Sequence, residues 1–351
     1  MAEKRPAERR INDLFVYNNR LYIGQGDAVV NTGPTDVVFY DFTRGKFITE
    51  FTVDEEAIYR YQEVDGQLVI PGVKATDTNR FGNLYIRTDT GWIKLQTIPN
   101  GVHINSLVSF RDQLFAGVDA FSEVGDGQKL FFGAIYVSSD RGRTWSISNT
   151  TQSDDRNIYR IRTIVEYKDK LYAFPYAFSP LKLNQIPDQY HQGLSKKPYK
   201  GYYLILTPDI MGKNDVVVYD GNLWQPDDIV DEKGICYILS PFVFYKKLVL
   251  PVIFGEYVDY LSLQEWMPIQ ARLKFFVYNG KKAQPLRFDC DRLFESSTAS
   301  LYMKERSVRL KKLSAQGSKR MVSSSGRLRK EIEPGMNMSI RRFILPGQIP
   351  S

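Results

Sequence analysis

A pair of apolar residues, always ten positions apart, recurs five times along the chain and limits its fold more than any other feature. The five pairs are Ile11 and Leu21, Ile58 and Leu68, Ile104 and Leu114, Ile161 and Leu171, and Ile238 and Leu248. Between the members of a pair lies a turn such as Asn18-Asn19 or Asp65-Gly66, whose residue types tolerate the backbone of a short hairpin. Recurrence at a fixed spacing indicates one structural unit copied along the chain.

A second hairpin follows each pair. Apolar, β-branched and aromatic residues alternate around a turn that contains glycine, in residues 37–47, 83–95, 134–147, 215–225 and 275–286. Two hairpins make a four-stranded meander, which is the content of one propeller blade, and a blade buries both faces only between neighbours. We therefore predict an all-β fold, a β-propeller of four-stranded blades. A β-sandwich is the alternative, but its strands have no reason to recur at this fixed spacing.

The repeat fades towards the C-terminus. A sixth start, Arg292-Leu293-Phe294 leading to Leu301-Tyr302, precedes a stretch from 303 to 351 with twelve Lys or Arg and three Asp or Glu. The expected organisation is a polar segment at 1–10, a propeller at 11–302 with five clear blades and an incomplete or degenerate sixth, and a basic, low-aromatic tail at 303–351. Three origins of the tail stay open: a natural disordered tail, a degenerate last blade, or a reading frame lost near Met303.

The net charge of +7 comes from this tail. The residues before Met303 hold 35 Lys or Arg against 37 Asp or Glu, so nucleic-acid binding is expected only through the tail. No apolar run is long enough to span a bilayer, and we expect no membrane partner. Residues 1–10 lack the apolar core of a secretory signal, which predicts a cytoplasmic protein if the chain is full length and a secreted one if a signal was removed.

Few residues of the kind that bind metals or nucleotides are present. The chain has two histidines and two cysteines, Cys236 and Cys290, with no metal-ligand spacing, so no metal site is predicted. Neither a G-x-G-x-x-G before a helix nor a Walker sequence occurs, and we predict no cofactor.

The third blade carries the sequence S-S-D-R-G-R-T-W at 138–145, which resembles the Asp-box, S-x-D-x-G-x-T-W, of the sialidase-like (BNR) β-propellers. All five informative positions match: Ser138, Asp140, Gly142, Thr144 and Trp145. In that family the box is a structural turn away from the active site. The resemblance implies that Asp140 braces the hairpin and that Trp145 packs between blades.

A second stretch, Y-R-I-R-T at 159–163, looks like the F/Y-R-I-P strand whose arginine holds a substrate carboxylate in sialidases. Here Arg162 stands at the proline position, and the stretch lies in the middle of the chain. The arginine triad, the Tyr–Glu nucleophile pair and the acid/base Asp of that family have no matching full set. The resemblance therefore covers the repeated body to about Tyr302 and concerns the fold.

Loop lengths predict which face of the propeller binds a ligand. In a blade with strands A to D, chain direction places the short A–B and C–D turns at one end and the B–C loops and blade-to-blade links at the other. The B–C loops grow to nearly the whole stretch from Pro175 to Asn214, so all large insertions lie on one face, which is typical of a binding surface. The ligand-binding candidates on this face are Arg60, Arg162, Arg292, His103, Asn105, Tyr59, Tyr237, Asp119, Glu123 and Glu256.

These residue types allow two kinds of function. Arg60, Arg162 and Arg292 could converge on an anion through paired hydrogen bonds, and aromatic rings suit a glycan or protein surface. The first hypothesis is a ligand-binding or scaffold propeller that recognises a glycan or protein. The alternative is a sialidase-like exo-glycosidase for an acidic sugar, with loop acids such as Asp119 and Glu123 transferring protons. Whether the protein is an enzyme, and its oligomeric state, stay open at this point.

Overall fold

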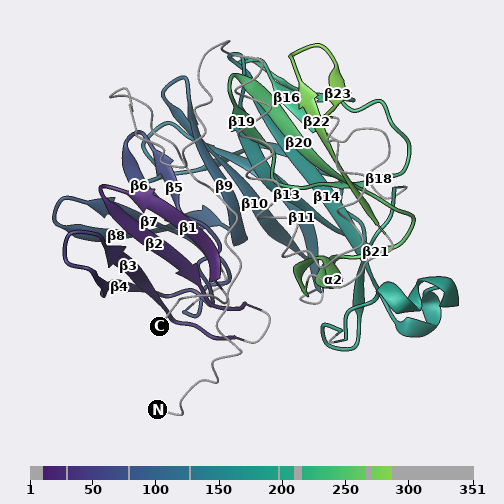
Figure 1. Cartoon of the computed structure of the whole chain (residues 1–351), viewed down its shortest axis with the longest axis horizontal. Helices are drawn as coiled ribbons and strands as arrows, with labels where there is room; N and C mark the ends of the chain where they lie inside the picture. Colours follow the sequence, from purple (N-terminus) through teal and green to yellow (C-terminus); the bar gives the residue numbers. More distant parts are fainter. Residues whose placement is uncertain are drawn as a thin grey trace, which may run out of the picture.

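The computed structural model describes residues 11–28, 31–77, 80–125, 128–196, 198–208, 216–265 and 271–286. Their strands form five antiparallel sheets, and each sheet is one blade of a β-propeller (Figure 1). Figure 1 shows blades 1 and 2 on one side and blades 4 and 5 on the other, with blade 3 between them. The predicted all-β propeller with five clear blades is confirmed, whereas the predicted sixth blade lies outside the described residues.

The first three blades are simple meanders in chain order. Blade 1 consists of β1 (Ile11–Tyr17), β2 (Arg20–Gln25), β3 (Thr35–Asp41) and β4 (Lys46–Val53). Blade 2 consists of β5 (Gln62–Val64), β6 (Gln67–Pro71), β7 (Phe81–Thr88) and β8 (Gly91–Pro99). Blade 3 consists of β9 (Gly101–Phe110), β10 (Gln113–Val124), β11 (Gln128–Ser138) and β12 (Ser146–Thr150).

The last two described blades are less regular. Blade 4 consists of β13 (Ile158–Glu166), β14 (Leu171–Leu181), β16 (Val216–Tyr219) and β17 (Trp224–Asp227). In blade 5 the first strand is split into β18 (Ile235–Ile238) and β19 (Phe242–Phe244), which both pair with β20 (Lys247–Phe254). The outer strands of blade 5 are β22 (Arg272–Tyr278) and β23 (Ala283–Pro285).

The tight turns between the first two strands of each blade have the backbone that the sequence predicted. Both central residues have positive φ in the first hairpin, where Asn18 is at 46° and Asn19 at 56°. The same holds at 65–66, 111–112, 168–169 and 245–246. Two consecutive residues of positive φ match the twist of the flanking strands, so the hairpins set the register of the repeated unit.

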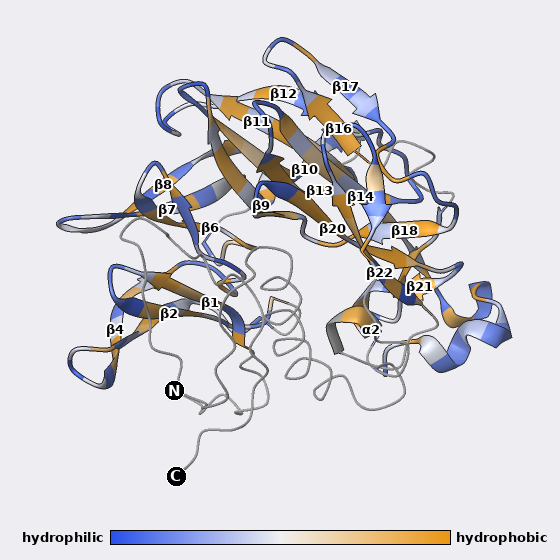
Figure 2. Cartoon of the chain, turned by 45° about the horizontal axis from the view of Figure 1, so that its top comes forward, coloured by the Kyte–Doolittle hydropathy of each residue, from blue (hydrophilic) through white to orange (hydrophobic). Residues whose placement is uncertain are grey.

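The repeated Ile and Leu residues attach each blade to the one before it. Ile58 and Leu68 of blade 2 are fully buried in a cluster with Phe15 and Tyr22 of blade 1. Ile161 and Leu171 of blade 4 pack in the same way on blade 3, as do Ile238 and Leu248 of blade 5 on blade 4. Figure 2 shows the result as hydrophobic colour along the inner strands β10, β13 and β20. Burial of such a side chain contributes about 1.5–3 kcal/mol, so each pair helps to fix one interface.

Blade 1 lacks this arrangement. Its own pair, Ile11 and Leu21, belongs to none of the hydrophobic clusters of the described chain, and Ile11 is 46% exposed. Clusters join blade 1 to 2, 2 to 3, 3 to 4 and 4 to 5, but none of them joins described residues of blade 5 to blade 1.

The long insertion between the second and third strands of blade 4 is more ordered than the predicted loop. It contains the 3-10 helices η3 (Leu183–Gln185) and η4 (Asp188–Gly193) and the strand β15 (Tyr203–Leu206). β15 pairs with β14 on one side and with β21 (Val258–Asp259) of blade 5 on the other. β21 leads into α2 (Tyr260–Glu265), so this second ladder ties blades 4 and 5 together near the loop-rich face.

Among the described residues, no helix combines the length and the apolar character that crossing a membrane requires.

Glu55 is an ionisable group buried in the link between blades 1 and 2. Its side chain accepts hydrogen bonds from Asn83 Nδ2 at 2.6 Å and Tyr85 Oη at 3.2 Å, and the residue is 1% exposed. Burial raises the pKa of this carboxyl to about 7, although the two donors oppose the shift.

This pKa predicts how stability changes with pH. The folded state holds the Glu55 proton more tightly than the unfolded state, whose carboxyl has a pKa near 4.5. The free energy of unfolding should therefore fall by about 3 kcal/mol as pH rises from about 4.5 to 7 and then level off for this group. Urea unfolding at pH 5, 6, 7 and 8 should show a shallower pH dependence for Glu55→Gln than for the wild type. The exposed control Asp89→Asn should keep the wild-type dependence, and equal slopes in all three proteins would contradict the assignment.

Candidate functional site

The mouth of the central channel on the loop-rich face is lined by residues that enter the first strand of each blade. Tyr59 lies in the link to blade 2, His103 and Asn105 lie on β9, and Arg162 lies on β13. Tyr237 lies on β18 of blade 5. Inner strands converge around a propeller channel, so residues far apart in sequence meet there.

Asp119 on β10 holds three neighbours at this mouth. His103 Nδ1 lies 2.8 Å from Asp119 Oδ2, and Arg160 Nη1 of blade 4 lies 2.9 Å from the same oxygen. Asn105 Nδ2 donates to Asp119 Oδ1 at 2.6 Å and to the carbonyl of Ile161 at 3.1 Å. The side chain of Asp119 is 6% exposed, so this is a buried network that joins blades 3 and 4.

The network fixes the charges of its members. Burial raises the pKa of Asp119, but the positive charge of Arg160 and the hydrogen bonds from His103 and Asn105 outweigh it and leave the pKa below its usual value. Burial lowers the pKa of His103, although Asp119 opposes this effect. At neutral pH, Asp119 is therefore an anion that pairs with Arg160, and His103 is a neutral ring whose Nδ1–H donates to the carboxylate.

Arg162, two residues beyond Arg160, has a different environment. Its Nε, like that of Arg160, is buried and has no hydrogen-bond partner among the described residues. Burial lowers the pKa of Arg162, but Tyr260, Tyr237, Tyr176 and the carboxylate of Asp119 together raise it, so the guanidinium keeps its charge. Arg162 therefore shares the Asp119 anion electrostatically with Arg160 and keeps one buried donor that the described residues do not satisfy.

Three tyrosines beside Arg162 form one aromatic cluster, which we call the tyrosine cluster: Tyr176, Tyr237 and Tyr260. The ring centroids of Tyr176 and Tyr237 are 4.7 Å apart, and those of Tyr176 and Tyr260 are 5.8 Å apart and stacked. Tyr176 Oη is buried next to the guanidinium of Arg160. Burial, with the nearby Tyr260 and Asp27, raises the pKa of Tyr59 to about 12, while Arg162 opposes the shift. Tyr59 of blade 2 thus faces the residues of blades 4 and 5 across the channel.

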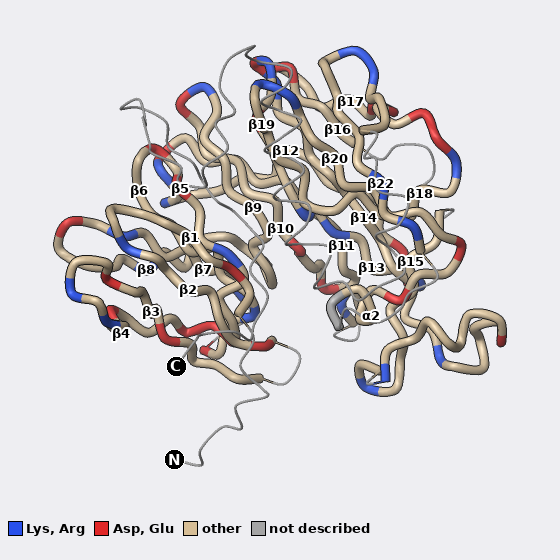
Figure 3. The backbone as a smooth tube through the Cα atoms, in the orientation of Figure 1, with Lys and Arg blue, Asp and Glu red and all other residues tan. Residues whose placement is uncertain are grey.

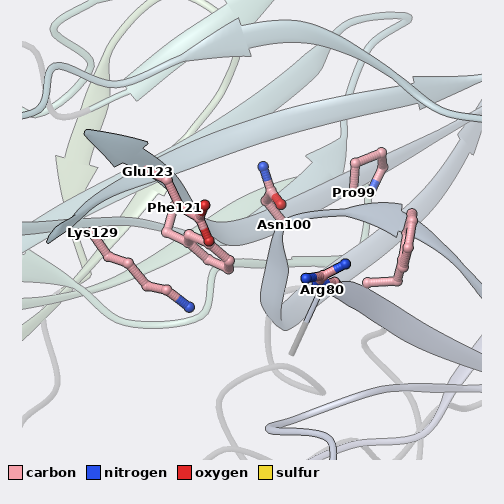
Figure 4. A pocket seen from close by; sticks show the side chains of 7 residues that line it. Arg80, Pro99, Asn100, Phe121, Glu123 and Lys129 are labelled. Carbon is pink, nitrogen blue, oxygen red and sulfur yellow. The ribbon is translucent and has the colours of Figure 1, made fainter. Parts of the chain in front are cut away.

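A second hollow lies on the same face between blades 2 and 3 (Figure 4). This rim pocket has a volume of about 660 Å³ and is lined by Arg80, Phe81, Pro99, Asn100, Phe121, Glu123 and Lys129. Lys129 Nζ lies 4.0 Å from the centroid of the Phe121 ring. Phe121 and Glu123 follow Asp119 at every second position of β10, so all three side chains project from one face of the strand. The rim pocket therefore continues outward from the channel mouth.

The structure separates the predicted candidates into groups. Tyr59, His103, Asn105, Asp119, Arg162 and Tyr237 lie at the channel mouth, whereas Glu123 lies in the rim pocket and is not paired with Asp119 as predicted. Glu256 is exposed and accepts a hydrogen bond from Tyr190 Oη of the blade 4 insertion. Arg60 is half-buried beside Tyr59. Arg292 lies outside the described residues, so the meeting of three arginines stays a prediction.

The prediction left three residues of the mouth out of its candidates: Arg160, Tyr176 and Tyr260. Arg160 precedes Arg162 by two positions on β13, where the strand has a β-bulge between Ile161 and Thr163, and this spacing was a usable signal. Tyr176 could be inferred from Arg160, because the two residues lie opposite each other in the pairing of β13 with β14. Tyr260 arrives on α2, and no local pattern marks it.

The residues of the predicted Asp-box form a hydrogen-bonded turn at the opposite end of blade 3. Asp140 accepts hydrogen bonds from Ser138 Oγ at 2.8 Å and from Thr144 Oγ1 at 2.6 Å, and Gly142 N donates to Ser138 Oγ at 2.8 Å. Trp145 packs on the cluster that joins blades 2 and 3, and its Nε1 donates to the carbonyl of Gly142 at 3.0 Å. These hydrogen bonds link Asp140 and Trp145 to residues of their own turn.

No group of three or more His, Cys, Asp or Glu residues in the described part of the chain is arranged to hold a metal ion. Cys236 is buried and is not in a disulfide.

Comparison with known proteins adds little to these observations. No protein-family model and no curated protein matches the chain. Among solved structures, it is similar to an α-L-arabinofuranosidase from Clostridium thermocellum, with 11% identity, a TM-score of 0.31 and coverage of 78% of this chain and 92% of that one.

Two further solved structures have comparable scores. An α-L-arabinanase from Cellvibrio cellulosa shows 10% identity, a TM-score of 0.39 and coverage of 79% and 95%. A prolyl endopeptidase shows 10% identity and a TM-score of 0.41, with coverage of 82% of this chain and 36% of that one. The sialidase-like family is not among these three, and the fold of this chain rests on its own strand order.

The Asp119 network yields a test of stability. Asp119→Asn removes the negative charge and leaves Arg160 buried without its counter-ion, which should lower the free energy of unfolding by about 3–5 kcal/mol. The control is Asp169→Asn, which breaks the exposed ion pair with Arg111 and should cost less than about 1 kcal/mol. Urea unfolding at pH 7 measures both, and equal effects would show that the network does not hold the two blades.

Proposed function

We propose that this β-propeller binds an acidic glycan at the channel mouth, with a carboxylate of the glycan against Arg162 and a sugar ring against the tyrosine cluster. The observation that carries the proposal is two charged arginines on one strand, Arg160 and Arg162, whose buried Nε atoms lack a hydrogen-bond partner among the described residues, with an ion pair printed only for Arg160. A guanidinium presents a fork of donors that matches a carboxylate. A bound anion would supply the pairing that the described side chains do not.

The surroundings of Arg162 support a sugar as the carrier of that anion. Tyrosine combines an apolar ring, which packs on the faces of sugar rings, with a hydroxyl that bonds to sugar hydroxyls. Tyr176, Tyr237 and Tyr260 supply three such rings beside Arg162. The rim pocket, with the Phe121 ring and Glu123 carboxylate on the same strand as Asp119, offers room for a further sugar unit.

The described acids support binding better than hydrolysis. Asp119 already accepts hydrogen bonds from His103 and Asn105 and pairs with Arg160, so its oxygens are occupied and it holds no proton to donate. Glu55, whose pKa is raised, lies buried among Asn83 and Tyr85 in the link between blades 1 and 2. Kinship with the sialidase-like propellers, supported by the turn at 138–145, remains part of this proposal and would add hydrolysis of a terminal acidic sugar.

Calorimetric titration with uronate- and sialate-terminated oligosaccharides tests the proposal. The wild type should bind at least one of them, and the methyl ester of the same sugar should bind much more weakly because it lacks the charge. Arg162→Gln should weaken binding about 10- to 100-fold, which is the effect expected for losing hydrogen bonds to a charged group. Arg143→Gln, an exposed arginine on the opposite face, should bind as the wild type does.

Three outcomes would change the conclusion. Equal affinity for acid and ester would remove Arg162 as the anion site. Binding of an acidic peptide in preference to every glycan would turn the site into a protein-recognition surface. Release of free acidic sugar that Arg162→Gln abolishes would establish the exo-glycosidase alternative.

A further inference from the structure

The face of blade 1 that points away from blade 2 is apolar and belongs to none of the hydrophobic clusters of the described chain. Two cross-strand rows form this outward face: Leu14, Ile23 and Val38, and Val16, Leu21 and Tyr40. Val16 is 44% exposed, and the other five are half-buried. The opposite face of the same sheet, with Phe15 and Tyr22, is buried against blade 2.

The equivalent positions of later blades are fully covered. Leu21 and Ile23 correspond to Leu68 and Ile70 in blade 2 by the repeat, and both of these are 0% exposed. In blade 5 the corresponding residues, Leu248 and Leu250, are also 0% exposed. Each of these pairs is covered by the preceding blade. The outward face of blade 1 therefore carries the same apolar residues that a preceding blade covers elsewhere, although blade 1 is the first blade of the chain.

The chain itself continues far enough to provide that neighbour. Blade 5 ends with β23, and the 65 residues from 287 to 351 follow it. Sixty-five residues are enough for a blade, because blade 2 spans only residues 62–99 and blade 3 only residues 101–150. In a closed propeller the last unit of the chain lies next to the first. The segment after blade 5 is thus the one that chain order brings to the outward face of blade 1.

Net charge gives weaker support. Residues 11–57 contain eight Asp or Glu and three Lys or Arg, whereas residues 303–351 contain twelve Lys or Arg and three Asp or Glu. Figure 3 shows acidic residues along the strands β3 and β4 of blade 1. Opposite net charges attract the two parts over about a Debye length, although Asp13, Glu50 and Glu55 are bonded to residues of blade 2 and do not lie on the outward face.

We propose that residues 287–351 cover the outward face of blade 1 and complete the ring. The segment would bury Leu21 and Val16 in the way that blade 1 itself buries Leu68. This inference does not depend on the proposed glycan site.

Limited trypsin digestion of the full chain tests it, because residues 287–351 are rich in cleavage sites. Leu21→Asp places a charge on the outward face and should speed the loss of this segment, followed by intact mass, at least tenfold relative to the wild type. The matched control is Ile147→Asp on β12, an apolar residue that is 52% exposed on the outer strand of blade 3. It should leave the cleavage rate unchanged. Equal rates in all three proteins would overturn the proposal.

A second measurement needs no variant. Backbone amides of residues 287–351 in the wild-type chain should exchange hydrogen at least tenfold more slowly than in an isolated peptide of the same sequence. Exchange at the rate of the free peptide would show that the segment does not cover blade 1. Sedimentation at micromolar concentration should give a monomer, and a dimer that Leu21→Asp dissociates would assign the face to a second copy.

Discussion

The contact on which the rest of this structure depends is the packing of each repeated Ile and Leu pair onto the preceding blade. A four-stranded blade has two apolar faces and buries them only between neighbouring blades, so the interfaces between blades provide much of the core. Leu68 on Phe15 and Tyr22, and Leu248 on the residues of blade 4, are instances of one rule repeated along the chain. The same packing curves the row of blades around a channel and brings their first strands together, and this convergence creates the site.

Within that site, two arginines on one strand have different roles because their neighbours differ. Arg160 lies beside the buried carboxylate of Asp119 and joins blade 4 to blade 3. Arg162 lies among tyrosines, which raise its pKa but leave its buried Nε without a partner among the described residues. Both arginines thus keep a buried Nε that the described residues do not satisfy, but only Arg160 forms an ion pair with Asp119. A ligand that carries an anion would stabilise the folded protein in proportion to how well it meets those donors.

Much of the fold could be predicted from local patterns. The ten-residue spacing, the turns at Asn18-Asn19 and Lys168-Asp169 and the alternating strands all result from interactions between residues close in sequence, and these predictions are confirmed. The pairing of β15 with β21 could not be predicted, since it joins two stretches that sequence analysis treats as loops. The site shows the same division. Polar residues at the start of each first strand were visible as candidates, but their partners depend on contacts between blades. Tyr260 reaches the channel on a short helix 98 residues after Arg162, and Glu123 lies opposite Lys129 in the β10–β11 hairpin.

The ladder from β14 through β15 to β21 has a consequence for ligand size. It couples blades 4 and 5, which together supply Arg162, Tyr176, Tyr237 and Tyr260, so these four side chains come from one connected set of strands. Tyr59 stands opposite on blade 2, two interfaces away around the ring. The distance between these four side chains and Tyr59 therefore depends on how strongly the row of blades curves. Small changes in how tightly successive blades wrap would widen or narrow the opening without any loop having to rearrange.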